Sequence, residues 1–247
     1  MSVLDWATRA ARFYTRWTQP IAFLARRFIA ESGRVLAPHP GGLCLDVGAG
    51  TAPYRAEIER HWNIVNYTAM DTAPSDSTSL MASADNVPLH SGVVDLVVSF
   101  DVLQHLQNYG QALDEMARVL RPGGAIILSV PFVYSECDMH DFRRWTMEGI
   151  VYELHIRGLD VVAAKTRGGM LFALGCLGVW AMQHILPGQR RGWRSRKNFI
   201  SMVRAIAIIV LTAIPLALTW IALALDSLLP RSGLYMGVLV CAQKRAA

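Results

Sequence analysis

Cysteine is scarce in this chain, and the few cysteines follow no binding pattern. Cys44, Cys137, Cys176 and Cys241 form no Cys-x-x-Cys pair and lie in no cluster with histidine at metal-ligand spacing. We therefore expect reduced thiols in the cytosol, no disulfide framework and no metal site.

Charged residues are also few. They make up 17% of the 247 residues, hydrophobic residues reach 53%, and the mean hydropathy is +0.29. Soluble domains usually have about 25% charged residues. This composition excludes a disordered chain, and the length suits one large core or one domain with an appendage. It also predicts more apolar surface than one soluble core would bury.

Acidic residues are nearly absent from both ends of the chain. Residues 1–34 contain six arginines against Asp5 and Glu31, and residues 161–247 contain eleven basic residues against Asp226 alone. The middle, residues 35–160, has sixteen acidic and seven basic residues. Arginines precede any long apolar run at the N-terminus, so we expect no cleavable secretory signal and a catalytic part that stays inside the cell.

Two long stretches contain no Asp, Glu, Lys or Arg: Gly168–Gln189 and Ala205–Leu225. Each is long enough for a bilayer core, but the loop between them is crowded with arginine, which tends to remain on the cytoplasmic side. We therefore predict a shallow or re-entrant hairpin on an anionic membrane surface. Association between copies of the chain is the alternative.

The N-terminal segment repeats apolar residues at steps of three and four, with arginines along one side. This pattern predicts interfacial helices, divided at Pro20, although the same helices could instead cover the core of the middle block. The stripe consists of Trp6, Ala10, Phe13, Trp17, Ile21, Leu24 and Phe28.

The middle block alternates strand-length apolar runs with helix-type segments, which predicts a doubly wound α/β sheet. The runs are Leu43–Val47, Ile64–Met70, Val93–Phe100 and Ala125–Val130, with Leu159–Lys165 and Leu234–Ala242 further on. Residues 111–120 have helical spacing, and Arg121–Gly124 is expected to end that helix and turn the chain.

Ligands of such sheets bind at the carboxyl ends of the strands. The first run is followed by Gly48, Ala49 and Gly50, which allow close backbone approach, and contains Asp46, which could pair with an ammonium group. Asp71 follows the second run and could accept both hydroxyls of a ribose. Each of these features alone could be an ordinary turn or loop residue.

Taken together, the segments Leu43–Gly50, Asp71, Ala84–Asp85, Asp95–His105 and Arg118–Gly124 resemble the class I S-adenosylmethionine-dependent methyltransferases. The resemblance implies a Rossmann-like, seven-stranded, mostly parallel sheet with an antiparallel last strand and helices on both faces. It also places the glycine loop against the methionine part of S-adenosylmethionine, Asp71 at the ribose, Asp85 and Asn86 at the adenine, and Phe100 near the methionine end.

On this basis the chain is expected to contain three parts. Residues 1–34 form amphipathic helices, residues 35–167 and 232–247 form the methyltransferase domain, and residues 168–231 form a hydrophobic helical insertion between the last two strands. A connection of this size usually carries function.

Catalytic candidates follow the fourth and fifth strands. His105 and His140 could act as general bases, since the imidazole pKa lies near neutrality. Asp141, Arg144 and Thr146 resemble a signature of bacterial methyltransferases found among surface-polysaccharide and lipid-modifying genes. Asp141 and Arg144 could equally pair with each other, and Thr146 could simply cap the next helix. Otherwise Arg143 or Arg144 could hold an acidic group of the acceptor.

The sequence thus predicts an O-methylating enzyme at the cytoplasmic face of the plasma membrane, acting on a lipid-linked or membrane-dissolved acceptor. The alternatives are a catalytically silent membrane adaptor and a nucleotide-cofactor oxidoreductase, whose third glycine and hydride-transfer site are not found. A nucleic-acid partner is not expected, because the middle block is acidic and the cations accompany oily segments.

Overall fold

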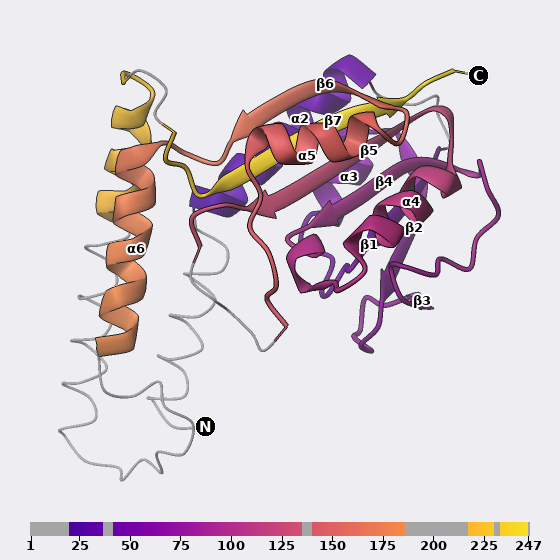
Figure 1. Cartoon of the computed structure of the whole chain (residues 1–247), viewed down its shortest axis with the longest axis horizontal. Coiled ribbons are helices and arrows are strands. Elements are labelled where there is room, and N and C mark those ends of the chain that lie inside the picture. The colour runs from indigo at the N-terminus through magenta and orange to yellow at the C-terminus, as the bar shows by residue number, and fades with distance from the viewer. Residues whose placement is uncertain (1–19, 37–41, 135–139, 186–216, 230–232, 247) are drawn as a thin grey trace, which may run out of the picture. The chain divides into compact units, whose positions relative to one another are not determined.

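The computed structural model describes residues 20–36, 42–134, 140–185, 217–229 and 233–246 (Figure 1). The chain divides into two compact units. One comprises residues 25–167 with 237–247 and contains the sheet; the other comprises residues 1–24 with 168–236. We call them the sheet unit and the helical unit.

The sheet unit contains seven strands in the order β3-β2-β1-β4-β5-β7-β6. Strands β1 to β5 run parallel to their neighbours, whereas β7 is antiparallel to both β5 and β6. The carboxyl ends of β1, β2, β4, β5 and β6 therefore lie at the same edge. This is the predicted Rossmann-like sheet with an antiparallel last strand. The strands are β1 Gly42–Val47, β2 Ile64–Asp71, β3 Leu80–Met81, β4 Val94–Phe100, β5 Leu120–Pro131, β6 Leu159–Thr166 and β7 Gly237–Lys244.

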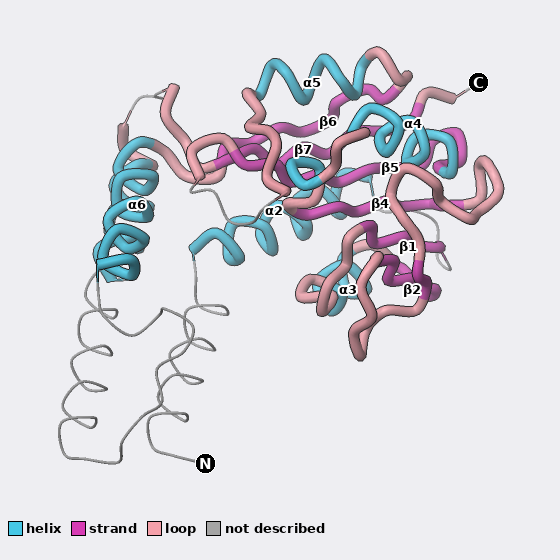
Figure 2. Tube along the Cα trace, turned by 60° about the horizontal axis from the view of Figure 1, so that its bottom comes forward, coloured by secondary structure: helices cyan, strands magenta, loops and turns pink. Residues whose placement is uncertain are grey.

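Helices cover both faces of this sheet (Figure 2). On one face lie α2 (Pro20–Leu36) and α3 (Arg55–His61), joined by a hydrogen bond of 3.0 Å from the Trp62 indole to the Ile29 carbonyl. On the other lie α4 (Tyr109–Val119) and α5 (Met147–His155), joined by the ion pair Arg157–Asp114. Strands covered on both faces read as continuous apolar runs, which is why the sequence located them within a few residues.

Residues 121–124 form a bulge inside a strand instead of the predicted turn between a helix and a strand. Helix α4 ends at Val119, but β5 begins at once with Leu120. Val94 pairs with Leu120 and Leu96 with Ala125, so residues 121–124 bulge out of the ladder, with Gly123 at a φ of +75°. The glycines provide the backbone freedom of a bulge inside the strand rather than a turn before it.

Helix α2 corrects part of the predicted interfacial stripe. Its described part starts at Pro20, the residue at which the sequence predicts a division between helices. Phe28, the last residue of the predicted stripe, is buried in the sheet unit together with Ala25 and Ile29. This part of α2 covers the core, the alternative left open above. The stripe residues before position 20 lie outside the described residues.

In the helical unit, α6 (Met170–Ile185) and residues 217–226 are helical. A Cβ atom at Gly175 would lie 3.1 Å from the Thr219 side chain, so the two helices approach closely there. Asp226 accepts hydrogen bonds from the backbone N–H groups of Gly169, Leu171 and Phe172. The only acidic side chain of residues 161–247 therefore caps the N-terminus of α6.

Replacing Asp226 with alanine should leave these three N–H groups without their acceptor and cost the helix about 1–2 kcal/mol. We expect roughly tenfold faster hydrogen exchange of the amides of residues 169–172. Asp226→Asn, which keeps one acceptor oxygen, is the matched control and should show a smaller change. Equal exchange in all three proteins would contradict the capping role.

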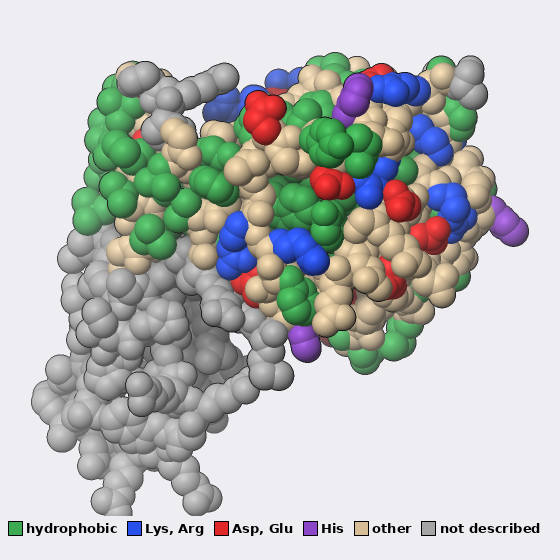
Figure 3. Space-filling view, viewed as in Figure 1, with side chains coloured by type: hydrophobic (Ala, Val, Ile, Leu, Met, Phe, Trp, Pro, Cys, Tyr) green, Lys and Arg blue, Asp and Glu red, His purple; other side chains and the backbone are tan. Residues whose placement is uncertain are grey.

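Apolar side chains remain exposed on the helical unit. They recur at helical spacing on both helices, and Figure 3 shows hydrophobic side chains gathered on the part of the surface that α6 forms. The exposed set is Met170, Leu174, Leu177, Leu218, Ile221, Leu225, Leu228 and Leu229. We call it the apolar stripe. None of the helices among the described residues combines the length and hydrophobicity needed to cross a membrane.

Candidate active site

The loop after β1 brings backbone rather than side chains to the edge of the sheet. Gly48 and Gly50 have φ values of +71° and +55°, the left-handed region that favours glycine. The N–H groups of Gly48 and Ala49 both donate to the Met70 carbonyl, which fixes the loop beside the end of β2. A Cβ atom at Gly50 would meet nothing within 4 Å, so its backbone is open to a ligand.

Gly48 and Gly50 allow a matched pair of substitutions. A Cβ atom at Gly48 would fall inside the Val102 side chain, whereas one at Gly50 has free space. Both alanines carry the cost of a left-handed backbone, about 1–2 kcal/mol, and only Gly48→Ala adds a steric cost of about 1–3 kcal/mol. Gly48→Ala should therefore be the less stable variant in urea unfolding. Equal stabilities would show that the loop moves freely away from Val102.

Asp71, at the end of β2, is bound to this loop. One carboxylate oxygen accepts from the Gly50 N–H at 2.8 Å and the other from the Ala73 N–H at 3.0 Å. Ser75 donates to the Gly50 carbonyl at 2.6 Å, so the loop is held from two sides. Each carboxylate oxygen keeps a further lone pair. The carboxylate can therefore accept further hydrogen bonds, as the predicted contact with a ribose requires.

Asp46 is buried in β1, with 4% of its surface exposed. It accepts a hydrogen bond from the Tyr67 hydroxyl. Burial, opposed by this hydrogen bond and assisted by the negative charge of Asp71, raises the pKa of Asp46 to about 7. A cation beside Asp46 would relieve this penalty, which fits the predicted pairing with an ammonium group.

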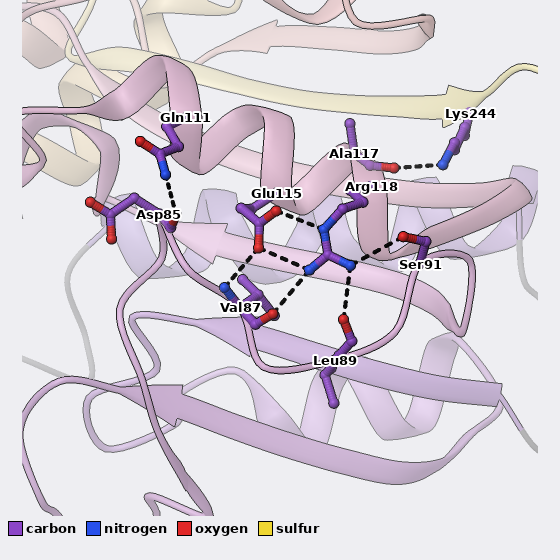
Figure 4. A network of polar contacts seen from close by, with 9 residues as sticks. All are labelled: Asp85, Val87, Leu89, Ser91, Gln111, Glu115, Ala117, Arg118 and Lys244. Carbon is purple, nitrogen blue, oxygen red and sulfur yellow. Dashed lines mark hydrogen bonds and ion pairs between the residues drawn. The ribbon is translucent and has the colours of Figure 1, made fainter.

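The loop with Ala84, Asp85 and Asn86 is fixed by α4 (Figure 4). Gln111 donates to the Asp85 carbonyl at 2.9 Å, and Arg118 donates to the carbonyls of Val87 and Leu89. Ala84 is buried, Asp85 is partly exposed and Asn86 is exposed. The Asp85 carboxylate accepts from Ser83, so its position is also defined by a side chain.

Phe100 ends β4 and contacts Tyr54 of the glycine loop, with ring centroids 4.5 Å apart. Burial and the charge of Asp101 raise the pKa of Tyr54 to about 12, so its hydroxyl stays neutral. The two rings form an apolar wall between the ends of β1 and β4.

The two histidine candidates come from different loops and meet. The Nδ1 atom of His105, in the short helix η1 (Leu103–His105), lies 3.1 Å from the backbone carbonyl of His140. The His140 ring is exposed and lies beside Phe142. The structure therefore places His105 closer to the body of the sheet unit than His140.

Asp141 and Arg144 pair with each other through two hydrogen bonds. Arg143 donates to the carbonyls of Leu106 and Gln107 and stacks over Tyr109. Thr146 accepts from the Gly149 N–H and caps α5. Arg143 thus holds the loop after β5 against the residues after β4. The Asp141–Arg144 pair and the Thr146 cap lie within the segment after β5, and they are the structural roles left open by the sequence. Residues 135–139 of the same loop lie outside the described residues.

Two features of the site were missed from the sequence. Tyr67 was read only as part of a strand, although it lies two residues before Ala69, the register partner of Asp46. The ion pair between Asp101 and Arg167 joins residues 66 positions apart and has no sequence spacing that predicts it. The available signal is the position of Arg167, which directly follows the sixth strand and precedes the uncharged stretch.

No group of histidine, cysteine and carboxylate side chains within the described ranges could hold a metal ion. Cys44, Cys176 and Cys241 are buried free thiols, and burial raises the pKa of each.

Part of the chain is similar to known methyltransferases. Residues 45–128 match a family model described as a methyltransferase domain. A malonyl-(acyl-carrier protein) O-methyltransferase of Serratia marcescens is 34% identical over 102 residues, which covers 37% of this chain and 39% of that protein. The matches to the first four curated relatives cover less than half of their length.

Solved structures agree on the fold. A putative sarcosine dimethylglycine methyltransferase from Galdieria sulphuraria aligns over the full length of both chains, with a TM-score of 0.58 and 13% identity. The cyclase SpnF also has a TM-score of 0.58, with 15% identity, over 90% of this chain and 82% of that one. The sheet order, the glycine loop, the carboxylate at the end of β2 and the methyltransferase domain matched by residues 45–128 together support the class I S-adenosylmethionine-dependent methyltransferase family as the family of this chain.

Proposed function

We propose that the protein transfers the methyl group of S-adenosylmethionine to an oxygen atom of a lipid-linked or membrane-dissolved acceptor at the cytoplasmic face of the plasma membrane. The observation that carries the proposal is the arrangement at the carboxyl edge of the sheet. There the buried carboxylate of Asp46 and the carboxylate of Asp71 lie on the neighbouring strands β1 and β2, and Gly50, with free space beside its Cα, lies in the loop after β1.

These residues fit the cofactor in charge and hydrogen-bonding capacity. Asp71 would accept the ribose hydroxyls, Asp46 would face the ammonium group, and the loop of Ala84 to Asn86 would lie at the adenine. When bound, S-adenosylmethionine supplies an electrophilic methyl group whose bonding electron pair to sulfur remains on sulfur. The protein must then align the acceptor and exclude water.

Oxygen as the acceptor atom is supported by the O-methyltransferase among the curated relatives. The fold alone does not decide the reaction, because a cyclase has the same architecture. The assignment as a methyltransferase rests on the matched domain and on the carboxylates, which suit this cofactor.

A lipophilic acceptor is supported by the helical unit. The apolar stripe presents uncharged side chains from two helices to solvent. The basic excess of residues 161–247 surrounds them in sequence, and each cation near an anionic surface contributes about 1 kcal/mol to binding. Exposed apolar side chains in a part of the chain that is rich in arginine and lysine suit the interface of an anionic membrane.

The proposal is tested by incubating the full chain with methyl-labelled S-adenosylmethionine and a bacterial lipid extract. We expect one lipid species to gain label and the mass of a methylene group. Asp71→Ala should abolish cofactor binding and labelling, while Asp71→Asn, which keeps an acceptor oxygen, should retain part of both. Label only in water-soluble products would reject the lipid acceptor. Tight cofactor binding with no labelled product would favour the silent adaptor.

A further inference from the structure

Arg167 connects two distant strands at the edge of the sheet that carries the site. It follows β6, and its guanidinium donates two hydrogen bonds to the Asp101 carboxylate, at 2.7 and 2.8 Å. Asp101 follows β4, and two strands, β5 and β7, lie between β4 and β6. The arginine side chain therefore reaches across the ends of these strands.

Gly237, the first residue of β7, makes room for this crossing. A Cβ atom there would lie 2.5 Å from Nη2 of Arg167 and 2.7 Å from its Nε. Arg167 is 1% exposed, and Nε has no hydrogen-bond partner among the described residues. A buried guanidinium is costly unless it is paired, so its position depends on Asp101.

Asp101 is held in an unusual conformation. Its φ is +55°, which is uncommon outside glycine, and its N–H donates to the Ser129 carbonyl. Oδ1 accepts from Ser129 and from Arg167, whereas among the described residues Oδ2 accepts from Arg167 alone. The side chain is 39% exposed. One lone pair of Oδ2 is thus available for a further donor.

The residues before and after Asp101 place it beside the glycine loop that follows β1. Phe100 contacts Tyr54 on one side, and Val102 packs against Gly48 on the other. Strained non-glycine residues concentrate at functional sites, where surrounding contacts hold them. Here Ser129 and Arg167 provide those contacts.

We propose, on the basis of the function proposed above, that Asp101 accepts the hydrogen bond of the acceptor hydroxyl and that Arg167 is its positioning residue. As the C–O bond forms and the C–S bond breaks, the hydroxyl proton passes to Oδ2 of Asp101 and then to solvent. A protonated ether oxygen is strongly acidic, so even an arginine-paired carboxylate can take this proton.

The charge balance favours a neutral hydroxyl as the ligand of Asp101. Arg167 already compensates the carboxylate, so the pair as a whole offers a cationic group little net attraction. A hydroxyl donor needs only the free lone pair, and its direction is set by the two guanidinium hydrogen bonds. The same residues therefore suit an uncharged hydroxyl donor better than a cationic group.

Two variants test the proposal. Arg167→Lys keeps a charge but loses the two-point hold on Asp101. The double variant Asp101→Asn with Arg167→Met removes both charges, which leaves no unpaired buried ion and preserves the fold more readily than either deletion alone. Binding of S-adenosylhomocysteine is measured by calorimetry, and methyl transfer is measured on the lipid fraction labelled by the wild-type protein.

We expect both variants to bind S-adenosylhomocysteine within about threefold of wild type. The kcat/KM for the labelled fraction should fall about 10-fold in Arg167→Lys, mainly through KM, and about 100-fold in the double variant, as expected for losing a hydrogen bond to a charged group. Weak cofactor binding by the double variant would assign Asp101 to the cofactor and overturn the proposal.

A kcat/KM for methyl transfer equal to that of the wild-type protein in either variant would also overturn the proposal, because the Asp101–Arg167 ion pair would then have only a structural role. If the double variant does not fold, Arg167→Lys decides alone: cofactor binding with unchanged kcat and KM rejects the role of Arg167. If the wild-type protein labels nothing, the proposed function fails instead, so the two failures are distinguishable.

Discussion

Replacing Asp46 with asparagine should make the protein more stable and bind its cofactor more weakly. The pKa of Asp46 is raised from 3.8 to about 7, mainly by burial. Between about pH 4 and pH 7 the Asp46 carboxyl group is therefore mostly protonated in the folded protein and mostly ionised in the unfolded chain. The stabilisation is fully present below about pH 4 and is lost as the pH rises through about 7, at a cost of about 4 kcal/mol.

An asparagine side chain cannot ionise, so Asp46→Asn should unfold at higher urea concentration than wild type at about pH 8 and at a similar concentration at about pH 4. Calorimetry with S-adenosylhomocysteine should show the opposite order of affinity at about pH 8, with the variant at least about 10-fold weaker. The wild-type affinity should fall as the pH drops below about 7, whereas that of the variant should change little.

Tyr67→Phe is the matched control for this experiment. The Tyr67 hydrogen bond lowers the pKa of Asp46, so its removal should raise that pKa further and move the loss of affinity to higher pH. If Asp46→Asn were less stable than wild type at every pH, Asp46 would be ionised and compensated in the free protein. The proposed contact with an ammonium group would then lose its support.

The sequence predicted the parts of this site that belong to single loops. Gly48, Gly50 and Asp71 follow apolar runs whose ends lie at one edge of a parallel sheet, so their meeting follows from the order of runs. For such residues, position along the chain is enough to predict their location at the edge of the sheet. The hydrogen bonds seen in the structure define their orientation and leave that predicted location unchanged.

The pairings were not predictable in the same way. Asp46 meets Tyr67 because of the register between β1 and β2, and Asp101 meets Arg167 because β6 ends at the same edge as β4. The antiparallel β7 between β5 and β6 determines this edge, and Gly237 permits the crossing. Neither register nor strand order is encoded in local spacing. Phe28 was misplaced for a related reason, since an apolar helix face does not identify what covers it.

The second large effect is expected at the apolar stripe. Leu218 and Leu225 are exposed and lie seven residues apart in one helix, so they share a face. In the proposed membrane contact both side chains enter lipid, each contributing about 1.5–3 kcal/mol. Leu218→Glu with Leu225→Glu should therefore reduce binding to vesicles containing phosphatidylglycerol by about 100-fold or more, measured by flotation, while binding of S-adenosylhomocysteine stays unchanged.

The matched control adds the same two charges to the sheet unit. Val65 is 72% exposed in β2, and Ile156 is exposed after α5, so Val65→Glu with Ile156→Glu changes net charge equally without touching the apolar stripe. This control should float nearly as well as wild type, with only the small loss due to charge. Equal losses in both double variants would mean that charge alone drives vesicle binding. Unchanged flotation of the stripe variant, combined with a smaller oligomer in solution, would assign the apolar stripe to contact between copies of the chain.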